Sequence, residues 1–128
     1  MATVAPAFFL GVLVWAGPAL ADPTYDKCIA GTSTNSEWAR CGSGYLKRLD
    51  RALNVAWKKA VSSLGDEQSR AQLLKEERAW ISFKDASCQL FANGHFGREG
   101  QVVHFVGCRA AIIKARIADL NGISALAH

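Results

Sequence analysis

Apolar residues recur at intervals of three and four along most of the chain, which is the spacing of an α-helix with one buried face. Three helices are predicted on this basis, over residues 34–64, about 67–91 and about 101–121. No alternating apolar and polar pattern of useful length predicts a β-strand. The fold class is therefore predicted to be all-α.

Short connections with residues that stop or start helices separate the predicted segments. Thr34 and Glu37 form a candidate capping box at the start of the first helix. Gly65 suits the end of that helix and Asp66 suits the N-cap of the next, while the glycine-rich segment 93–100 is typical of a loop. These connections predict a small antiparallel three-helix bundle, in which a long helical hairpin is followed by a third helix.

The hairpin geometry predicts which residues of the first two helices face each other. A turn near residue 65 places residue 50 opposite about residue 80, within the segment ERAWISFKDASC at 77–88. Aromatic residues among charges also fit a ligand cage, but at helical spacing they more often bury their surface between helices. We therefore expect an interhelical contact with a polar bridge beside an aromatic residue. The residues expected there are Asp50, Asn54, Arg78, Trp80 and Asp85.

The first residues have the pattern of a secretory signal peptide. The apolar run from Ala5 to Ala16 is too short to span a bilayer, and Ala19-Leu20-Ala21 offers the small residues that signal peptidase recognises. Cleavage there removes residues 1–21 and leaves residues 22–128 as one helical domain. No Lys or Arg precedes the run, so a buried N-terminal helix or a membrane anchor is the alternative. Export predicts a periplasmic or secreted protein whose mature form has no membrane span.

Four cysteines follow the predicted signal peptide, and an even number in a small exported chain predicts two disulfides. Cys88 and Cys108 flank the glycine-rich loop, so folding back of the second and third helices brings them level. Cys28 lies only 13 residues before Cys41, within reach of a local loop. The favoured pairing is Cys28–Cys41 with Cys88–Cys108. The alternative, Cys41–Cys88 with Cys28–Cys108, requires the N-terminal segment to cross the bundle.

The net charge of +4 makes the chain moderately basic. In an exported protein this charge favours anionic envelope polymer or lipid headgroups as partners over nucleic acid, although an ordinary soluble surface has the same charge. A candidate basic binding face lies off the apolar stripe of the first helix. Its residues are Lys47, Arg48, Arg51, Lys58 and Lys59.

Catalytic and metal-binding patterns are weak. Glu76 and Glu77 are sequence neighbours and point to different helix faces, so they do not form the carboxylate pair of an enzyme. A series of Cys88, His95, His104 and Cys108 has a spacing that fits zinc, but an oxidising compartment favours a disulfide instead. No enzyme activity, metal or cofactor is therefore expected.

Several motifs together resemble one known family. They are NSEWARC ending at Cys41, RLDRALNVAW with Asp50 and Asn54, and LLKEERAWISFKDASC with Arg78, Trp80, Asp85 and Cys88. The chain is similar in these motifs to the LprI-like family of small exported bacterial proteins named for lysozyme inhibition. The resemblance covers nearly the whole mature chain. Glu77 departs from it, because the family usually has glutamine at that place.

The resemblance implies an all-helical domain that binds and blocks lysozyme-type muramidases, and it supplies no inhibitory residues to carry over. Many lysozymes are basic, so an inhibitor of charge +4 needs a local acidic or shape-matched surface for this binding. Binding of anionic envelope material by the basic face is the alternative function, and salt would weaken it strongly.

Overall fold

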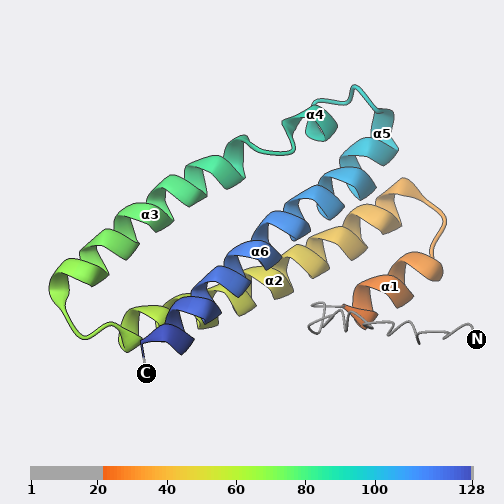
Figure 1. The fold of residues 1–128 in the computed structure, drawn as a ribbon. Helices are drawn as coiled ribbons and strands as arrows, with labels where there is room; N and C mark the ends of the chain where they lie inside the picture. Colours follow the sequence, from red (N-terminus) through yellow and green to blue (C-terminus); the bar gives the residue numbers. More distant parts are fainter. Residues whose placement is uncertain (1–21, 128) are drawn as a thin grey trace, which may run out of the picture.

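The computed structural model describes residues 22–127, and helices account for most of them (Figure 1). The predicted signal peptide, residues 1–21, lies outside this range. The elements in chain order are α1 (Pro23–Ala30), α2 (Asn35–Ser63), α3 (Glu67–Ala86), α4 (Gln89–Ala92), α5 (Gly97–Glu99), the π-helical turn η1 (Gly100–His104) and α6 (Phe105–Leu126). No strand occurs within the described range, and the all-α prediction is confirmed.

The three long helices follow an up-down-up course. In Figure 1, α2 and α6 run side by side in the same direction, and α3 returns antiparallel to both. The short helix α1 folds back against the N-terminal half of α2, where Tyr25 stacks on Tyr45 with ring centroids 4.6 Å apart. The predicted bundle of three helices is therefore present, with α1 added at one end.

The tightest helix pair is α2 with α6, and a glycine of α2 marks its closest approach. A Cβ atom on Gly42 of α2 would lie 2.5 Å from Val106 Cγ2 of α6, so the backbone of α2 approaches α6 closely at this point. The buried apolar residues of this contact are Tyr45, Leu49, Leu53, Ala56 and Ala60 on α2, and Val106, Ala110, Ile113, Ile117 and Leu120 on α6. Their spacing is the predicted apolar stripe of each helix.

Helix α3 lies further from the core. Of its residues 67–86, Leu73 and Glu77 alone are buried, and Trp80 packs on the core with part of its surface exposed. Glu77 is joined to Arg116 of α6, whose Nε and Nη2 both donate to Oε2 at 2.8 and 2.6 Å. This pair of long charged side chains bridges the space between α3 and α6, and α3 stands apart from the closely packed α2 and α6 (Figure 1).

The polar bridge predicted between the first and second helices, which are α2 and α3 in the structure, is wrong. Asp50 and Arg78 are both exposed, and within the described residues no ion pair joins them. Asp50 instead faces a groove beside Arg98 and Gln101, on the side of α2 that contacts η1 and α6. The ion pair that α3 does form, Glu77–Arg116, joins it to α6 and not to α2. Asn54 is exposed as well.

The core interpretation of the segment 77–88 holds for Trp80 and fails for its apolar neighbours. Ile81 and Phe83 keep 43% and 58% of their surface exposed, because α3 turns these side chains away from the distant core. Asp85 is exposed at the end of α3, with its Oδ1 4.0 Å from Arg109 Nη1 of α6.

Local sequence signals predicted some helix ends correctly and others incorrectly. The capping box of Thr34 and Glu37 is present, and Asp66 caps α3 by accepting a hydrogen bond from the Ser69 N–H. The predicted second helix ends early, at Ala86, and Cys88 with a φ of 68° separates it from the short α4. The third continues past Asn121-Gly122 to Leu126, because those two residues face solvent while Ser124 is buried.

Both predicted disulfides are present. Cys28–Cys41 ties α1 to α2, and Cys88–Cys108 ties the end of α3 to α6, with Cα–Cα separations of 5.8 and 5.9 Å. All four cysteines are therefore paired, and the alternative connectivity is excluded.

Gly42→Ala is expected to destabilise the protein by about 1–3 kcal/mol, because the added methyl group overlaps Val106. Gly107→Ala in α6 is the matched control, since a Cβ atom there meets nothing within 4 Å. This control should gain up to about 1 kcal/mol from helix propensity. Urea unfolding of both variants measures the difference, and equal stabilisation by both would contradict the close approach of α2 and α6.

Arg116→Met is expected to cost about 3–5 kcal/mol of unfolding free energy, because it leaves the buried Glu77 carboxylate without a partner. The double variant Glu77→Leu with Arg116→Met should recover most of this loss, since it removes both charges. Chemical denaturation of the single and double variants provides the comparison. A single variant as stable as the wild type would show that the pair is not buried in solution.

Candidate functional site

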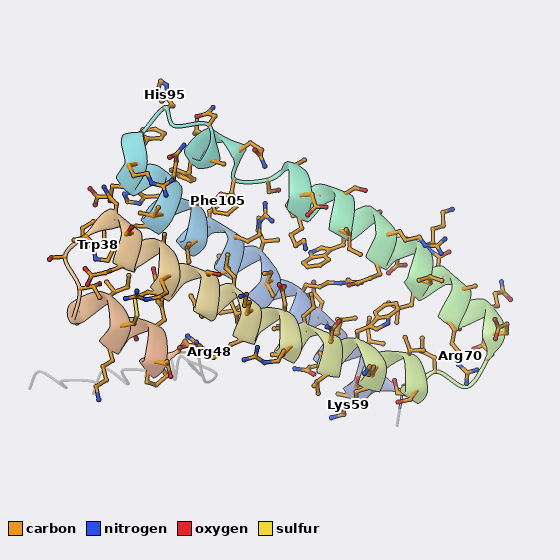
Figure 2. All side chains as sticks on the ribbon, turned by 180° about the vertical axis from the view of Figure 1, so that it is seen from behind. Trp38, Arg48, Lys59, Arg70, His95 and Phe105 are labelled. Carbon is orange, nitrogen blue, oxygen red and sulfur yellow. A yellow bond between two sulfur atoms is a disulfide. The ribbon has the colours of Figure 1, made fainter. Side chains whose placement is uncertain are left out.

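The residues of the predicted basic face do not all lie on one surface in the structure. Lys47, Arg51 and Lys58 are exposed on one side of α2, and Arg40, which the sequence analysis did not include, continues the same row at helical spacing. Lys59 is exposed further round the helix, where Figure 2 shows it pointing away from the core. The positive charge of these five residues is larger than the net charge of +4 of the whole chain. The charges of the remaining 10 basic and 11 acidic residues therefore nearly cancel.

Arg48 does not belong to this free basic row. Its Nε and Nη2 donate to the two carboxylate oxygens of Asp22 at 2.7 and 2.8 Å, which holds α1 against α2. Asp22 also caps α1 by accepting a hydrogen bond from the Tyr25 N–H at 2.7 Å. The Arg48 hydrogen bond holds the pKa of the Asp22 carboxyl below its usual value; partial burial opposes this shift, and the Tyr25 N–H adds to it.

A second candidate surface is the segment of residues 88–100 at one end of the molecule, which we call the tip segment. It contains α4, α5 and the turns around them, and Figure 2 shows His95 at its outer edge. Leu90 and Phe96 keep 55% and 52% of their surface exposed, and Arg98 and Glu99 are exposed beside them. The tip segment is thus a projection with apolar, aromatic and charged side chains in contact with solvent.

Local hydrogen bonds brace the tip segment. Asn93 Oδ1 accepts from the His95 N–H at 2.9 Å, and the Gly97 N–H donates to the Gly94 carbonyl at 2.9 Å. Gln101 Nε2 donates to the Ala92 carbonyl at 3.0 Å. Gly94 and Gly97 have φ of 85° and 70°, a backbone region that glycine adopts without strain.

Aromatic packing and the disulfide complete this bracing. The Phe91 ring lies 5.6 Å from that of Phe96 and 5.9 Å from that of His104, centroid to centroid. The backbone of Gly100 lies against Phe96, since a Cβ atom there would be 2.7 Å from Phe96 Cβ. At the base, Arg109 Nη2 donates to the Ser87 carbonyl at 3.3 Å, next to Cys88–Cys108.

The zinc interpretation of the histidines and cysteines in this region is wrong. Cys88 and Cys108 are bonded to each other, so neither thiolate is free for a metal. Among residues 22–127, no group of three or more His, Cys, Asp or Glu side chains is arranged to hold a metal ion.

A third surface feature is a groove at the opposite end, near the turn between α2 and α3. Its volume is about 640 Å³, with Leu64, Leu73 and Ile123 as apolar lining and Asp66 and Glu76 among its polar residues. The groove is concave and open, whereas the tip segment projects. It carries none of the candidate site residues that the sequence analysis named.

Sequence reasoning missed two features that the sequence does signal. Arg116 lies within the apolar series Ile113, Ile117 and Leu120. This position buries its charge, so it requires a partner of opposite charge. The dipeptide Asp22-Pro23 is a start signal for α1, with an N-cap residue followed by proline at the first helical position.

Comparison with protein families gives one match. The matching family is described as lysozyme inhibitor LprI, and the match covers residues 28–120. The chain belongs to this family. The matched range begins at Cys28 and includes both disulfides of this chain, all of α2 and α3, and the tip segment. Searches of curated proteins and of solved structures found no match.

Membership in the LprI family and the two disulfides favour a location outside the cytoplasm, because structural disulfides persist in oxidising compartments. Within residues 22–127, none of the helices combines the length and the apolar character needed to cross a membrane.

Asp22→Asn is expected to lower stability by about 1 kcal/mol near neutral pH, because asparagine keeps the helix cap but loses the charged hydrogen bonds to Arg48. The native pKa of Asp22 is lowered, so this stabilisation is complete above the unfolded pKa of about 3.9 and is lost as the pH falls through the native pKa. The difference between wild type and variant should therefore shrink below about pH 4.

Thermal unfolding at a series of pH values measures that difference. Comparison with the variant is essential, because the pKa values of Glu37 and Asp66 are also lowered, by their capping hydrogen bonds, and these residues lose stabilisation in the same window. A difference that stays constant from neutral to acidic pH would contradict the ion pair.

Proposed function

We propose that this protein is exported to the periplasm after removal of residues 1–21, and that it binds and blocks lysozyme-type muramidases there. The observation that carries the proposal is the match to the lysozyme inhibitor LprI family over residues 28–120. The two disulfides support it, because they suit a small binding scaffold outside the cytoplasm.

The protein acts in this proposal by binding alone. The neighbouring carboxylates Glu76 and Glu77 support a binding role, because Glu77 is buried in its pair with Arg116 while Glu76 is exposed on a different face. A glycosidase instead needs two carboxyl groups that flank one substrate position. Glu77 serves the packing of α3 and is not available for such chemistry.

The charge distribution answers the objection that a basic inhibitor repels a basic lysozyme. The excess positive charge lies along the exposed side of α2, in the row from Arg40 to Lys58. The remaining surface is nearly balanced in charge, so a lysozyme can approach there without strong repulsion. The proposal therefore places the inhibitory contact away from the exposed side of α2.

Binding of anionic envelope polymer by this basic row is the alternative function. Lys47, Arg51 and Lys58 are exposed along one helix side, which fits a polyanion. Such binding would also slow the lysis of cell walls, because it covers the substrate. The two functions therefore require a test that separates the enzyme from its wall.

The mature protein, residues 22–128, is expected to slow lysozyme on cell walls and also on a soluble, uncharged chito-oligosaccharide substrate. Inhibition of the soluble substrate requires contact with the enzyme, and it should persist when salt is raised from low to physiological concentration. Assays with c-type and phage-type lysozymes measure it, with the reduced and alkylated protein as the control.

Two results would contradict the proposal. Full activity on both substrates at a large molar excess of the protein would remove the lysozyme function. Protection of cell walls that disappears with salt, together with full activity on the soluble substrate, would favour the polyanion alternative.

A further inference from the structure

We propose that the tip segment, residues 88–100, is the surface that enters the substrate cleft of the lysozyme, with Phe96 as its apolar anchor and His95 and Arg98 as hydrogen-bond donors to the cleft. This inference rests on the proposed function and adds the contact surface to it. The partner is a muramidase whose cleft binds sugar rings and contains catalytic carboxyl groups.

The shape of the tip segment fits a cleft. It projects at one end of the molecule, with His95 at its outer edge (Figure 2). The groove at the other end and the groove beside Asp50, which Arg98 lines from the tip segment, are both concave, so neither fills a cleft in a partner. Among the described surfaces, the tip segment therefore offers the convex complement that blocking a cleft requires.

The composition of the tip segment fits a binding anchor. Phe96 is about half exposed, and its ring and that of His95 lie edge to face with a centroid distance of 5.0 Å. Leu90 is exposed to a similar degree. Exposed aromatic side chains that are held in one position lose little entropy on binding and often dominate the affinity of an interface.

The bracing of the tip segment supplies the rigidity that this role needs. The disulfide Cys88–Cys108 fixes its base, and the hydrogen bonds of Asn93 and Gln101 fix its turns. A segment that is already in its bound shape avoids the free-energy cost of ordering when it binds. This bracing exceeds what a plain connection between α3 and α6 requires, because the helices need only a short turn to reverse direction.

The charges of the tip segment suit carboxylates. His95 is exposed at its outer edge, and Arg98 is exposed with its Nη1 donating to Gln101 Oε1 at 3.1 Å. Glu99 is the one acidic residue of this segment. A glycosidase of the lysozyme type holds two carboxyl groups at the bond it cleaves, and guanidinium and imidazole groups donate hydrogen bonds to carboxylates.

The test is inhibition of lysozyme on the soluble substrate by matched variants of the mature protein. Phe96→Ala is expected to raise the inhibition constant about 10-fold or more, as removal of an interface anchor does. Phe83→Ala is its control, because Phe83 is an equally exposed phenylalanine on α3. The double variant His95→Ala with Arg98→Ala should also weaken inhibition, whereas Arg51→Ala with Lys58→Ala on α2 should not.

A competition experiment separates the cleft from other sites on the lysozyme. A non-hydrolysed chito-oligosaccharide that occupies the cleft should displace the wild-type protein in a binding assay. Phe96 also packs inside the tip segment, so circular dichroism and the thermal midpoint of each variant accompany the measurement. The histidine and arginine variant keeps the test decisive if Phe96→Ala alters the segment.

The outcomes distinguish this inference from the proposed function. Absence of inhibition by the wild type overturns both. Inhibition by the wild type that the tip variants and the oligosaccharide leave unchanged overturns the inference and leaves the proposed function in place. Loss confined to the tip variants, with competition by the oligosaccharide, supports both.

Discussion

The buried ion pair between Glu77 and Arg116 decides where α3 lies, and the course of α3 decides how the tip segment is presented. Helices α2 and α6 form a close pair through buried apolar residues, which needs no charge to hold it. Helix α3 contributes Leu73, Trp80 and the carboxylate of Glu77 instead, so the guanidinium of Arg116 fixes its position, with the Trp80 ring 5.9 Å away. A buried pair adds little net stability over apolar residues, but a slip of α3 by one turn would strand both charges. The pair therefore acts mainly to fix the register of α3. Comparison of the double variant with the wild type separates this role from a contribution to stability.

From this fixed helix the chain passes into the tip segment, which lies between α3 and the returning helix α6 (Figure 1). Helix α3 ends at Ala86, and the bond from Cys88 to Cys108 ties this point to α6. The disulfide and Arg109 hold the base, while the exposed side chains of Leu90, His95 and Phe96 point into solvent. The same molecule carries its excess positive charge on the other exposed surface, along α2. The tip segment is a braced, nearly neutral projection, and the exposed side of α2 is basic. This arrangement is consistent with a protein that binds an enzyme through the tip segment and leaves α2 for solvent or for anionic material.

Features that depend on neighbouring residues were predictable from the sequence, and features that depend on distances between helices were not. The caps at Thr34 and Asp66, the three long helices and both disulfides follow from local pattern and connection length. The exposure of Ile81 and Phe83 does not, because it depends on how far α3 stands from the core. The Asp50–Arg78 bridge failed because hairpin counting fixes height along the helix axes, but neither the distance between the helices nor the rotation about their axes. Arg116 within its apolar stripe was the signal that a buried partner was needed, and Glu77 was that partner. The role proposed for the tip segment had no sequence signal beyond its glycines and its flanking cysteines.

Hydrogen–deuterium exchange of the mature protein, with and without an excess of lysozyme, tests the central claim most directly. It reports which backbone amides the enzyme covers without any change to the inhibitor. The account predicts slower exchange in residues 89–100 when lysozyme is bound, with little change along the exposed side of α2. Slower exchange along α2 or at the groove near Asp66, with the tip segment unchanged, would contradict it.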